Sequence, residues 1–260
     1  MSRDAELKII SFDGITIDSE RGIAVFTPLP TYLTLLTDIT MSNPYGVCHY
    51  KGSTYVGLND NTIARIDSNY KLYESFINCS GSVDSVVIYK DLVYMLLYTG
   101  SQYRTVKVCD MSGKEITQWG HFCFTYPSNV LTIVSDQVVI ADPPNKRITV
   151  YSLDGQILRQ VPCSLLSNYY GFMCAVDDCS VVYSDHNSSK VFRVNINTGD
   201  VMWTCSDIKE PQGITVYGRG YVLVARNNCS SVKVLDIKTG KYQNIYILSV
   251  IKIILRAIGL

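Results

Sequence analysis

The sequence of 260 residues contains only three histidines, His49, His121 and His186, and they are scattered along the chain. A Ser-His-Asp or Cys-His catalytic site needs a histidine beside its nucleophile, and no local motif places one there. The chain also lacks a glycine-rich phosphate loop, a Gly-x-Ser-x-Gly elbow and a His-Glu-x-x-His helix. These absences argue against catalysis, and we expect a protein that is not an enzyme and uses no cofactor.

Charge and cysteine spacing exclude further classes. The 23 Lys and Arg residues equal the 23 Asp and Glu residues, so no net field attracts nucleic acid or an acidic membrane. The nine cysteines are odd in number and include no Cys-x-x-Cys pair, which argues against a disulfide framework and against a zinc ribbon. The first residues show no export signal, and the apolar residues 245–260 are interrupted by Lys252 and Arg256. We expect a cytoplasmic protein without a metal and without a membrane span.

The chain is rich in residues that favour β-strands. It contains 19 tyrosines and many Val and Ile residues, and only 18% of its residues are charged. β-Branched and aromatic side chains pack well on a pleated surface that is half or fully buried. The composition therefore favours an all-β fold.

A strand pattern recurs about every 42 residues, a period within the range of known repeat architectures. Five segments share an apolar, variable, basic-or-Val, apolar, polar core, and they are residues 63–67, 106–110, 148–152, 191–195 and 232–236. A turn follows each segment, marked in four copies by Gly113, Gly155, Gly199 and Gly240. Two apolar runs precede each segment and one strand follows the turn, so each copy contains four strands. Four short strands per repeat are typical of a β-propeller blade.

A weaker sixth copy begins near residue 14 and is about ten residues shorter than the others. We therefore predict a six-bladed β-propeller with four-stranded antiparallel blades over residues 14–247. Residues 1–13 form an N-terminal segment in which 7–12 are a spare strand that could pair with the last blade and close the ring. Residues 248–260 are an apolar tail. A β-sandwich and a seven-bladed ring with a missing blade are the alternatives, but a sandwich does not need such a long internal repeat.

The repeat resembles the NHL family, whose unit reads Pro-x-Gly-Ile, a strand ending in Asp, Asn-x-Arg-(Ile/Val) and a Gly turn. The third copy matches best, with Asp142, Asn145, Arg147 and Gly155 in place, and Asp185 repeats the Asp position in the next copy. The resemblance implies a binding module such as the C-terminal propeller of tripartite-motif proteins. The RING finger, B-boxes and coiled coil of those proteins are not seen in this sequence, so ubiquitin-ligase chemistry is not assigned.

The loops between the second and third strands of each blade gather at one end of a propeller. They bring together basic and aromatic candidates for partner binding, namely Tyr103, Arg104, Lys146, Arg147, His186, Lys190 and Arg226. Some of these residues could instead have a structural role that stabilises the loops. Asp142 could pair with Arg147 and Asp185 with Lys190, and the side chain of Asn145 could cap its turn. Arg104 and Arg226, which lack such an Asp, are therefore the better contact candidates.

Three functions remain open. We expect a non-catalytic scaffold that binds a protein or peptide through this loop face. Single-stranded RNA stacked on Tyr103 is an alternative on the same face. A gluconolactonase-like hydrolase with a divalent ion in the channel is the enzymatic alternative, but the innermost strands offer few carboxylates to hold the ion.

Overall fold

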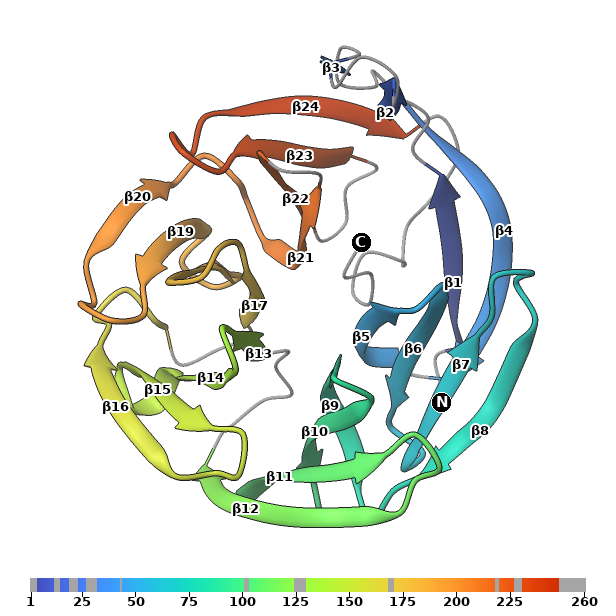
Figure 1. Ribbon diagram of the computed structural model, residues 1–260. Coiled ribbons are helices and arrows are strands. Elements are labelled where there is room, and N and C mark those ends of the chain that lie inside the picture. Colours follow the sequence, from blue (N-terminus) through green and yellow to red (C-terminus); the bar gives the residue numbers. More distant parts are fainter. Residues whose placement is uncertain are drawn as a thin grey trace.

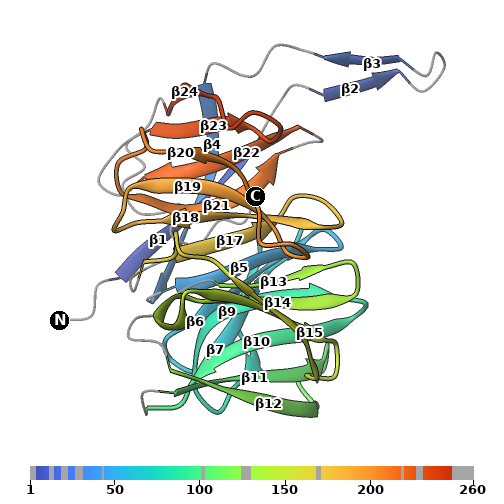
Figure 2. The ribbon, with the colours of Figure 1, turned by 90° about the vertical axis from the view of Figure 1, so that its left-hand side faces the viewer.

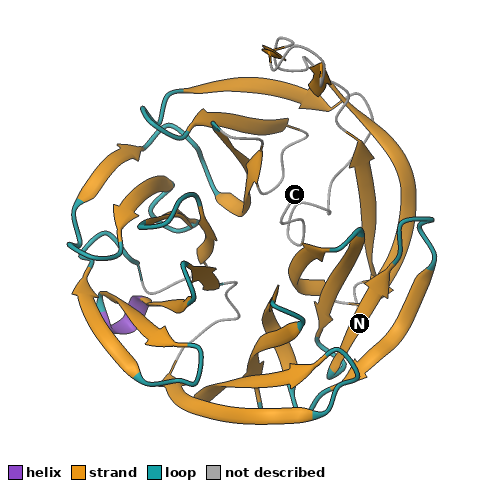
Figure 3. Cartoon of the chain, viewed as in Figure 1, coloured by secondary structure: helices purple, strands orange, loops and turns teal. Residues whose placement is uncertain are grey.

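The computed structural model describes residues 4–11, 15–18, 23–26, 32–42, 44–100, 103–123, 130–167, 171–217, 220–226 and 231–247. These residues form β-strands arranged in a ring around a central axis, with one short 3-10 turn at Pro143–Asn145 (Figures 1 and 3). The predicted tail, residues 248–260, lies outside the described residues.

The ring contains five complete four-stranded antiparallel blades, of which four are separate sheets and the fifth is part of a six-stranded sheet. The first blade contains β5 (Pro44–Tyr50), β6 (Ser53–Leu58), β7 (Thr62–Ile66) and β8 (Leu72–Asn78). The second contains β9 (Ser82–Tyr89), β10 (Leu92–Tyr98), β11 (Tyr103–Asp110) and β12 (Glu115–Cys123). The third contains β13 (Leu131–Val134), β14 (Gln137–Asp142), β15 (Arg147–Ser152) and β16 (Ile157–Pro162). The fourth contains β17 (Gly171–Ala175), β18 (Ser180–Asp185), β19 (Lys190–Asn195) and β20 (Val201–Cys205), and the fifth contains β21 (Pro211–Tyr217), β22 (Tyr221–Arg226), β23 (Ser231–Asp236) and β24 (Tyr242–Ile247).

The blades follow the predicted repeat, and each of the five shared core segments is a third strand. The first strand of each blade lies nearest the channel and the fourth forms the outer rim (Figure 1). Because successive strands run in opposite directions, the second-to-third loops lie at one end of the ring, which we call the loop face. The first-to-second and third-to-fourth turns lie at the other end, the turn face.

The core lies between the blades and is built mainly by their second and third strands. Strand β18 is buried at every position and β14 at all but its first, whereas the outer strands β16 and β20 are mostly exposed. Sheets covered on both faces need strands that are continuously apolar, which explains runs such as Val-Val-Ile in β14. Each completely buried Val, Leu or Ile stabilises the fold by about 1.5–3 kcal/mol.

The polar residue that ends each core segment caps the turn that follows. The backbone N–H groups of Asn69 and Lys71 donate to Oδ1 of Asp67 at 2.9 and 3.0 Å, and those of Ser112 and Lys114 donate to Oδ1 of Asp110 at 2.8 and 3.0 Å. The bond from Lys71 is the main reason why the pKa of Asp67 lies below its usual value. The repeat therefore keeps Asp, Asn or Ser here because an oxygen must accept from the turn.

Each turn glycine lies against the outer strand of the preceding blade. Gly155 has a φ of 93°, and a methyl group on it would lie 2.3 Å from Cγ of Trp119. A methyl group on Gly240 would likewise lie 2.7 Å from Cδ2 of Trp203. The supporting residues are Ile77, Trp119 and Val161, at equivalent positions of their outer strands, and Trp203, two residues before the equivalent position. Glycine is thus required both by the left-handed backbone and by the close approach of the neighbouring blade.

The sixth position of the ring differs from the prediction of another four-stranded blade. Strands β1 (Asp4–Ser11) and β4 (Tyr32–Ser42) pair with each other there, while β2 (Ile15–Asp18) and β3 (Ile23–Phe26) form a separate hairpin that projects from the ring (Figure 2). The stretch of chain from the start of β2 to the start of β5 is shorter than that between the first strands of any two successive blades. This unit is too short to repeat the path of the others.

The ring closes by a different contact from the one expected. The spare N-terminal strand is present as β1, but it pairs with β4 over eight residue pairs and not directly with the last blade. Strand β4 makes the contact to the last blade, in parallel with β24, through two residue pairs. All six strands form one sheet in the order β1-β4-β24-β23-β22-β21.

Candidate functional site

The loop face of the third blade is held by its own side chains. Asn145 Nδ2 donates to both carboxylate oxygens of Asp142, and Arg147 Nε donates to Asp142 Oδ2 at 3.0 Å. Lys146 adopts the left-handed conformation with a φ of 52°, and its Nζ donates to the carbonyl oxygen of Leu166. Asp142, Asn145 and Arg147 thus form the loop-holding arrangement expected from their spacing.

In the fourth blade, Asp185 is a buried cap and not an ion-pair partner of Lys190. Its carboxylate accepts from the backbone N–H and the hydroxyl of Ser167, at 2.7 and 2.6 Å, and from the N–H groups of Asn187 and Ser188. Asp185 is fully buried, and four donors satisfy it without a cation. The expected ion pair with Lys190 is therefore wrong, although the two residues are opposite in the β-ladder. Lys190 and His186 are both half-buried.

Arg104 is not available as the contact residue that the sequence suggested. It is only 4% exposed, and its Nε donates to Asp84 Oδ2 at 2.7 Å, so it does have an acidic partner. Its guanidinium also lies over the ring of Tyr98, 4.7 Å from the centroid. Asp84 lies on the innermost strand β9, and burial raises its pKa despite the attraction of Arg104. The two partners lie on different strands that are not neighbours in sequence, so no local signal predicted this pair.

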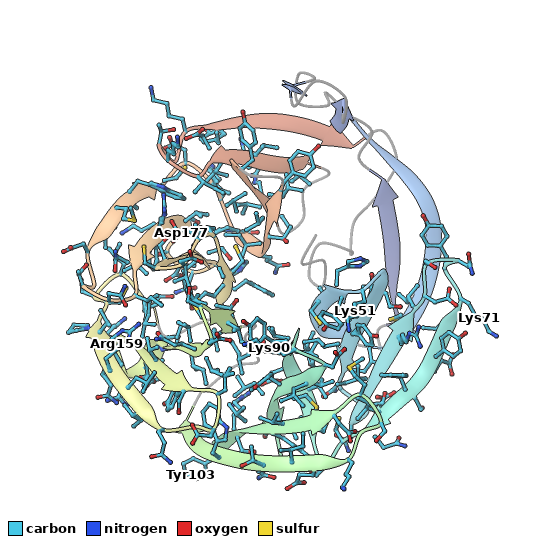
Figure 4. All side chains as sticks on the ribbon, viewed as in Figure 1. Lys51, Lys71, Lys90, Tyr103, Arg159 and Asp177 are labelled. Carbon is cyan, nitrogen blue, oxygen red and sulfur yellow. The ribbon has the colours of Figure 1, made fainter. Side chains whose placement is uncertain are left out.

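The remaining predicted residues are Arg226 and Tyr103. Arg226 is half-buried, and its Nε donates to the carbonyl oxygen of Lys209 at 3.2 Å. Tyr103 is 40% exposed at the start of β11 (Figure 4). The structure therefore brings the predicted residues to one face, but it binds Arg104, Lys146, Arg147 and Arg226 to oxygens of the protein itself.

The turn face carries a repeated contact that the sequence reading missed. Lys51 of the first blade pairs with Asp91 of the second at 2.7 Å, and Lys90 of the second pairs with Asp136 of the third at 2.5 Å. We call these contacts the clasps, and Figure 4 shows Lys51 and Lys90 near the channel. The lysines hold the pKa of both carboxyl groups below the usual value. The Tyr-Lys pairs at 50–51 and 89–90 were the available signal.

Exposed apolar side chains also collect toward the turn face. Those exposed by 39 to 59% near the third-to-fourth turns are Tyr70, Tyr73, Ile116, Ile157, Leu158, Val201 and Met202. Tyr103 is the one large apolar residue of comparable exposure that the described residues place on the loop face.

The described residues contain no group of three or more His, Cys, Asp and Glu side chains that could hold a metal ion. Burial raises the pKa of Cys48 and Cys174 to about 12 and that of Cys79 to about 11. These thiols are protonated at neutral pH and are therefore poor nucleophiles. Within the same part of the chain, no helix has the length and apolar character needed to cross a membrane.

Comparisons with known proteins show the fold. Neither a scan against protein-family models nor a search of the curated proteins gave a match. Among solved structures, virginiamycin B lyase from Staphylococcus aureus is similar with a TM-score of 0.58 and 14% identity, covering 80% of this chain and 71% of the lyase. A protein of unknown function from Bacteroides caccae has a TM-score of 0.59 and 10% identity over 93% of both chains.

The computationally designed Ika8 protein is also similar, with a TM-score of 0.55 and 19% identity. The match covers 78% of this chain and 61% of the designed protein, so the chain spans about three fifths of that protein's length. These likenesses show a β-propeller, and at such low identity they show the fold alone.

Proposed function

We propose that the chain is a non-catalytic scaffold whose loop face binds a protein or a peptide. The observation that carries the proposal is that four of the basic residues on this face are held by the protein itself. Arg104 is paired with Asp84, Arg147 with Asp142, and Lys146 and Arg226 with backbone carbonyl oxygens. A polyanion gains affinity when accessible Lys and Arg side chains displace the counterions condensed on it, and these four side chains are already engaged. A mixed polar surface with an exposed aromatic residue suits a peptide better.

From the motif residues of the third copy we also propose that the repeat is NHL-like and that the chain acts as an interaction module in the cytoplasm. The lyase is similar to this chain in fold only. A propeller scaffold uses its rigid strands to present loops, and loops on a rigid frame commonly carry binding residues. Tyr103 is the expected anchor, since it presents a large amphipathic surface with few rotatable bonds.

The test is a selection of peptides from a displayed library on the immobilised chain, followed by affinity measurement in solution. Tyr103→Ala is expected to weaken the selected peptides by about 10-fold or more, as for a central aromatic anchor. Tyr70→Ala is the matched control, because Tyr70 is 43% exposed on the turn face. It should leave the affinity unchanged.

Two results would contradict the proposal. One is a set of peptides whose affinity depends on Tyr70 and not on Tyr103. The other is tight binding of single-stranded RNA that falls steeply with salt, which would favour the RNA alternative on the same face.

A further inference from the structure

Five exposed apolar side chains occupy equivalent places in three successive blades. They are Ile116 on β12, Ile157 and Leu158 on β16, and Val201 and Met202 on β20, each at the turn-face end of an outer strand. Their exposed fractions run from 42 to 59%. We call this set the turn-face patch.

A β-bulge accompanies the patch in every one of these blades. The register of the third and fourth strands shifts at Ile116, at Leu158 and at Met202. A bulge twists an edge strand and interrupts its row of hydrogen-bonding groups, so addition of another strand is disfavoured there. A partner on the patch must therefore bind through side chains and not by extending the sheets.

The charge of the residue just before the outer strand changes sign across the three blades. This residue is Lys114 in the second blade, Gln156 in the third and Asp200 in the fourth, and all three are exposed. The charge thus runs from positive through neutral to negative at equivalent positions around the ring. The series is complementary to its own reverse.

A second copy of this chain carries that reverse series. Consider two copies stacked turn face to turn face, related by a two-fold axis that lies between the two faces and passes between the two third blades. The third blades then face each other, and the second blade of each copy faces the fourth blade of the other. Lys114 then lies opposite Asp200 twice, and Ile116 lies opposite Met202. An isologous interface requires this kind of self-complementarity.

We propose that the turn-face patch is a self-association surface that joins two copies of this chain in this arrangement. The equal numbers of acidic and basic residues leave no net charge to oppose the approach of a second copy. In the same arrangement the first and fifth blades place Lys71 opposite Lys241, so attraction is confined to the second, third and fourth blades. The inference does not depend on the proposed function, because the two surfaces lie at opposite ends of the ring.

Sedimentation velocity over about 1 to 200 µM protein tests the proposal, since this range covers micromolar dissociation constants. The wild-type chain is expected to form a dimer that dissociates on dilution. Leu158→Glu is expected to give a monomer. Lys114→Asp and Asp200→Lys, each alone, bring like charges together twice and should raise the dissociation constant about 10-fold or more.

The double variant Lys114→Asp with Asp200→Lys restores opposite charges and should return the dissociation constant to within about 3-fold of wild type. Lys209→Asp, an exposed charge reversal on the loop face, is the control and should dimerise as the wild type does. Thermal melting of every variant verifies that it is folded. A monomeric wild type over the whole range, or folded single and double charge variants that dimerise alike, would overturn the proposal.

Discussion

At the residue scale, the third-to-fourth turn glycines combine two constraints that are usually separate. Gly155 needs a positive φ, and it also has no room for a side chain because Trp119 of the preceding blade lies against it. Gly52 has a φ of 74° but meets no atom within 4 Å of an added methyl group. The two glycines therefore allow the backbone cost and the packing cost to be measured apart.

Gly52→Ala is expected to lower the free energy of unfolding by about 1–2 kcal/mol, the cost of a left-handed conformation for an L-residue. Gly155→Ala should cost about 1–3 kcal/mol more, because Trp119 must also move. Urea denaturation of both variants measures the difference. Equal losses would show that Trp119 yields without cost and that the close packing is unimportant.

The buried pair of Asp84 and Arg104 is a second feature of this scale. Arg104→Met leaves the Asp84 carboxylate without its cation, and we expect a loss of about 3–5 kcal/mol at neutral pH. Burial raises the pKa of Asp84, so its folded state favours the protonated acid and loses stability as the pH rises through that pKa. The loss in Arg104→Met should consequently shrink as the pH is lowered toward 4.

The double variant Asp84→Leu with Arg104→Met removes both charges and should recover most of the stability at neutral pH. Chemical denaturation of the three proteins at several pH values provides the comparison. A single variant as stable as the wild type at neutral pH would mean that the pair contributes nothing to the fold.

At the scale of elements, neighbouring blades are joined by polar contacts, and the clasps among them connect residues that are equivalent in the repeat. The clasps connect the innermost turns of the first three blades, while Arg159 and Arg193 donate to the backbone carbonyl oxygens of Ile196 and Ile237 in the next blade. Ser184 adds a bond of 2.6 Å to the carbonyl oxygen of Gln212. Each interface therefore combines an apolar core with a few polar bonds that fix the position of one blade against the next.

The clasp of Lys90 with Asp136 predicts a defined acid dependence. Lys90 and Tyr89 hold the pKa of Asp136 below its unfolded value, so the clasp stabilises the fold above about pH 4 and ceases to do so as the pH falls through the folded pKa. Asp136→Asn should melt below wild type at pH 7, and the two melting temperatures should converge as the pH falls through the folded pKa of Asp136. Glu74→Gln, at an exposed site on β8, is the control.

High salt should also reduce the difference between Asp136→Asn and wild type at pH 7, because both partners of the clasp are exposed. A difference that persists unchanged at acid pH and in high salt would show that Asp136 acts through packing and not through its charge.

The strands were predictable from the sequence because their signal is local and repeated. Five copies of the third strand and the glycines at 113, 155, 199 and 240 follow from the repeat period. The clasps and the Asp84–Arg104 pair were not predictable in this way. Each clasp joins two different blades, and Asp84 and Arg104 lie on strands of one blade that are not adjacent, so these contacts depend on the folded structure. Basic loop residues were read as accessible since sequence alone does not reveal an acidic partner on another strand.

At the scale of the whole molecule, the ring consists of five regular blades and one irregular position. Strands β1 and β4 fill that position, and their contact with the fifth blade is limited to two residue pairs. The strands of the short N-terminal unit were predicted correctly, but their arrangement in a four-stranded blade was not, because a strand pattern does not specify which sheet each strand joins. We therefore expect this position to be the weakest part of the ring.

Deletion of residues 1–12 removes β1 and leaves β4 without its partner over eight residue pairs. We expect a lower melting temperature and faster amide hydrogen exchange in β24, since the ring then opens more readily beside the fifth blade. Calorimetry and exchange mass spectrometry measure both effects. An unchanged melting temperature would contradict a closing role for β1.

The contact of each turn glycine with the preceding outer strand has a consequence for engineering. Trp119 fits against Gly155 and Trp203 against Gly240, whereas Ile77 and Val161 are smaller supports for Gly113 and Gly199. A blade moved to another place in the chain would meet a support of the wrong size, even though its own strands would be intact. Modules that can be exchanged in this protein are therefore not blades but the units that run from one outer strand to the turn that rests on it.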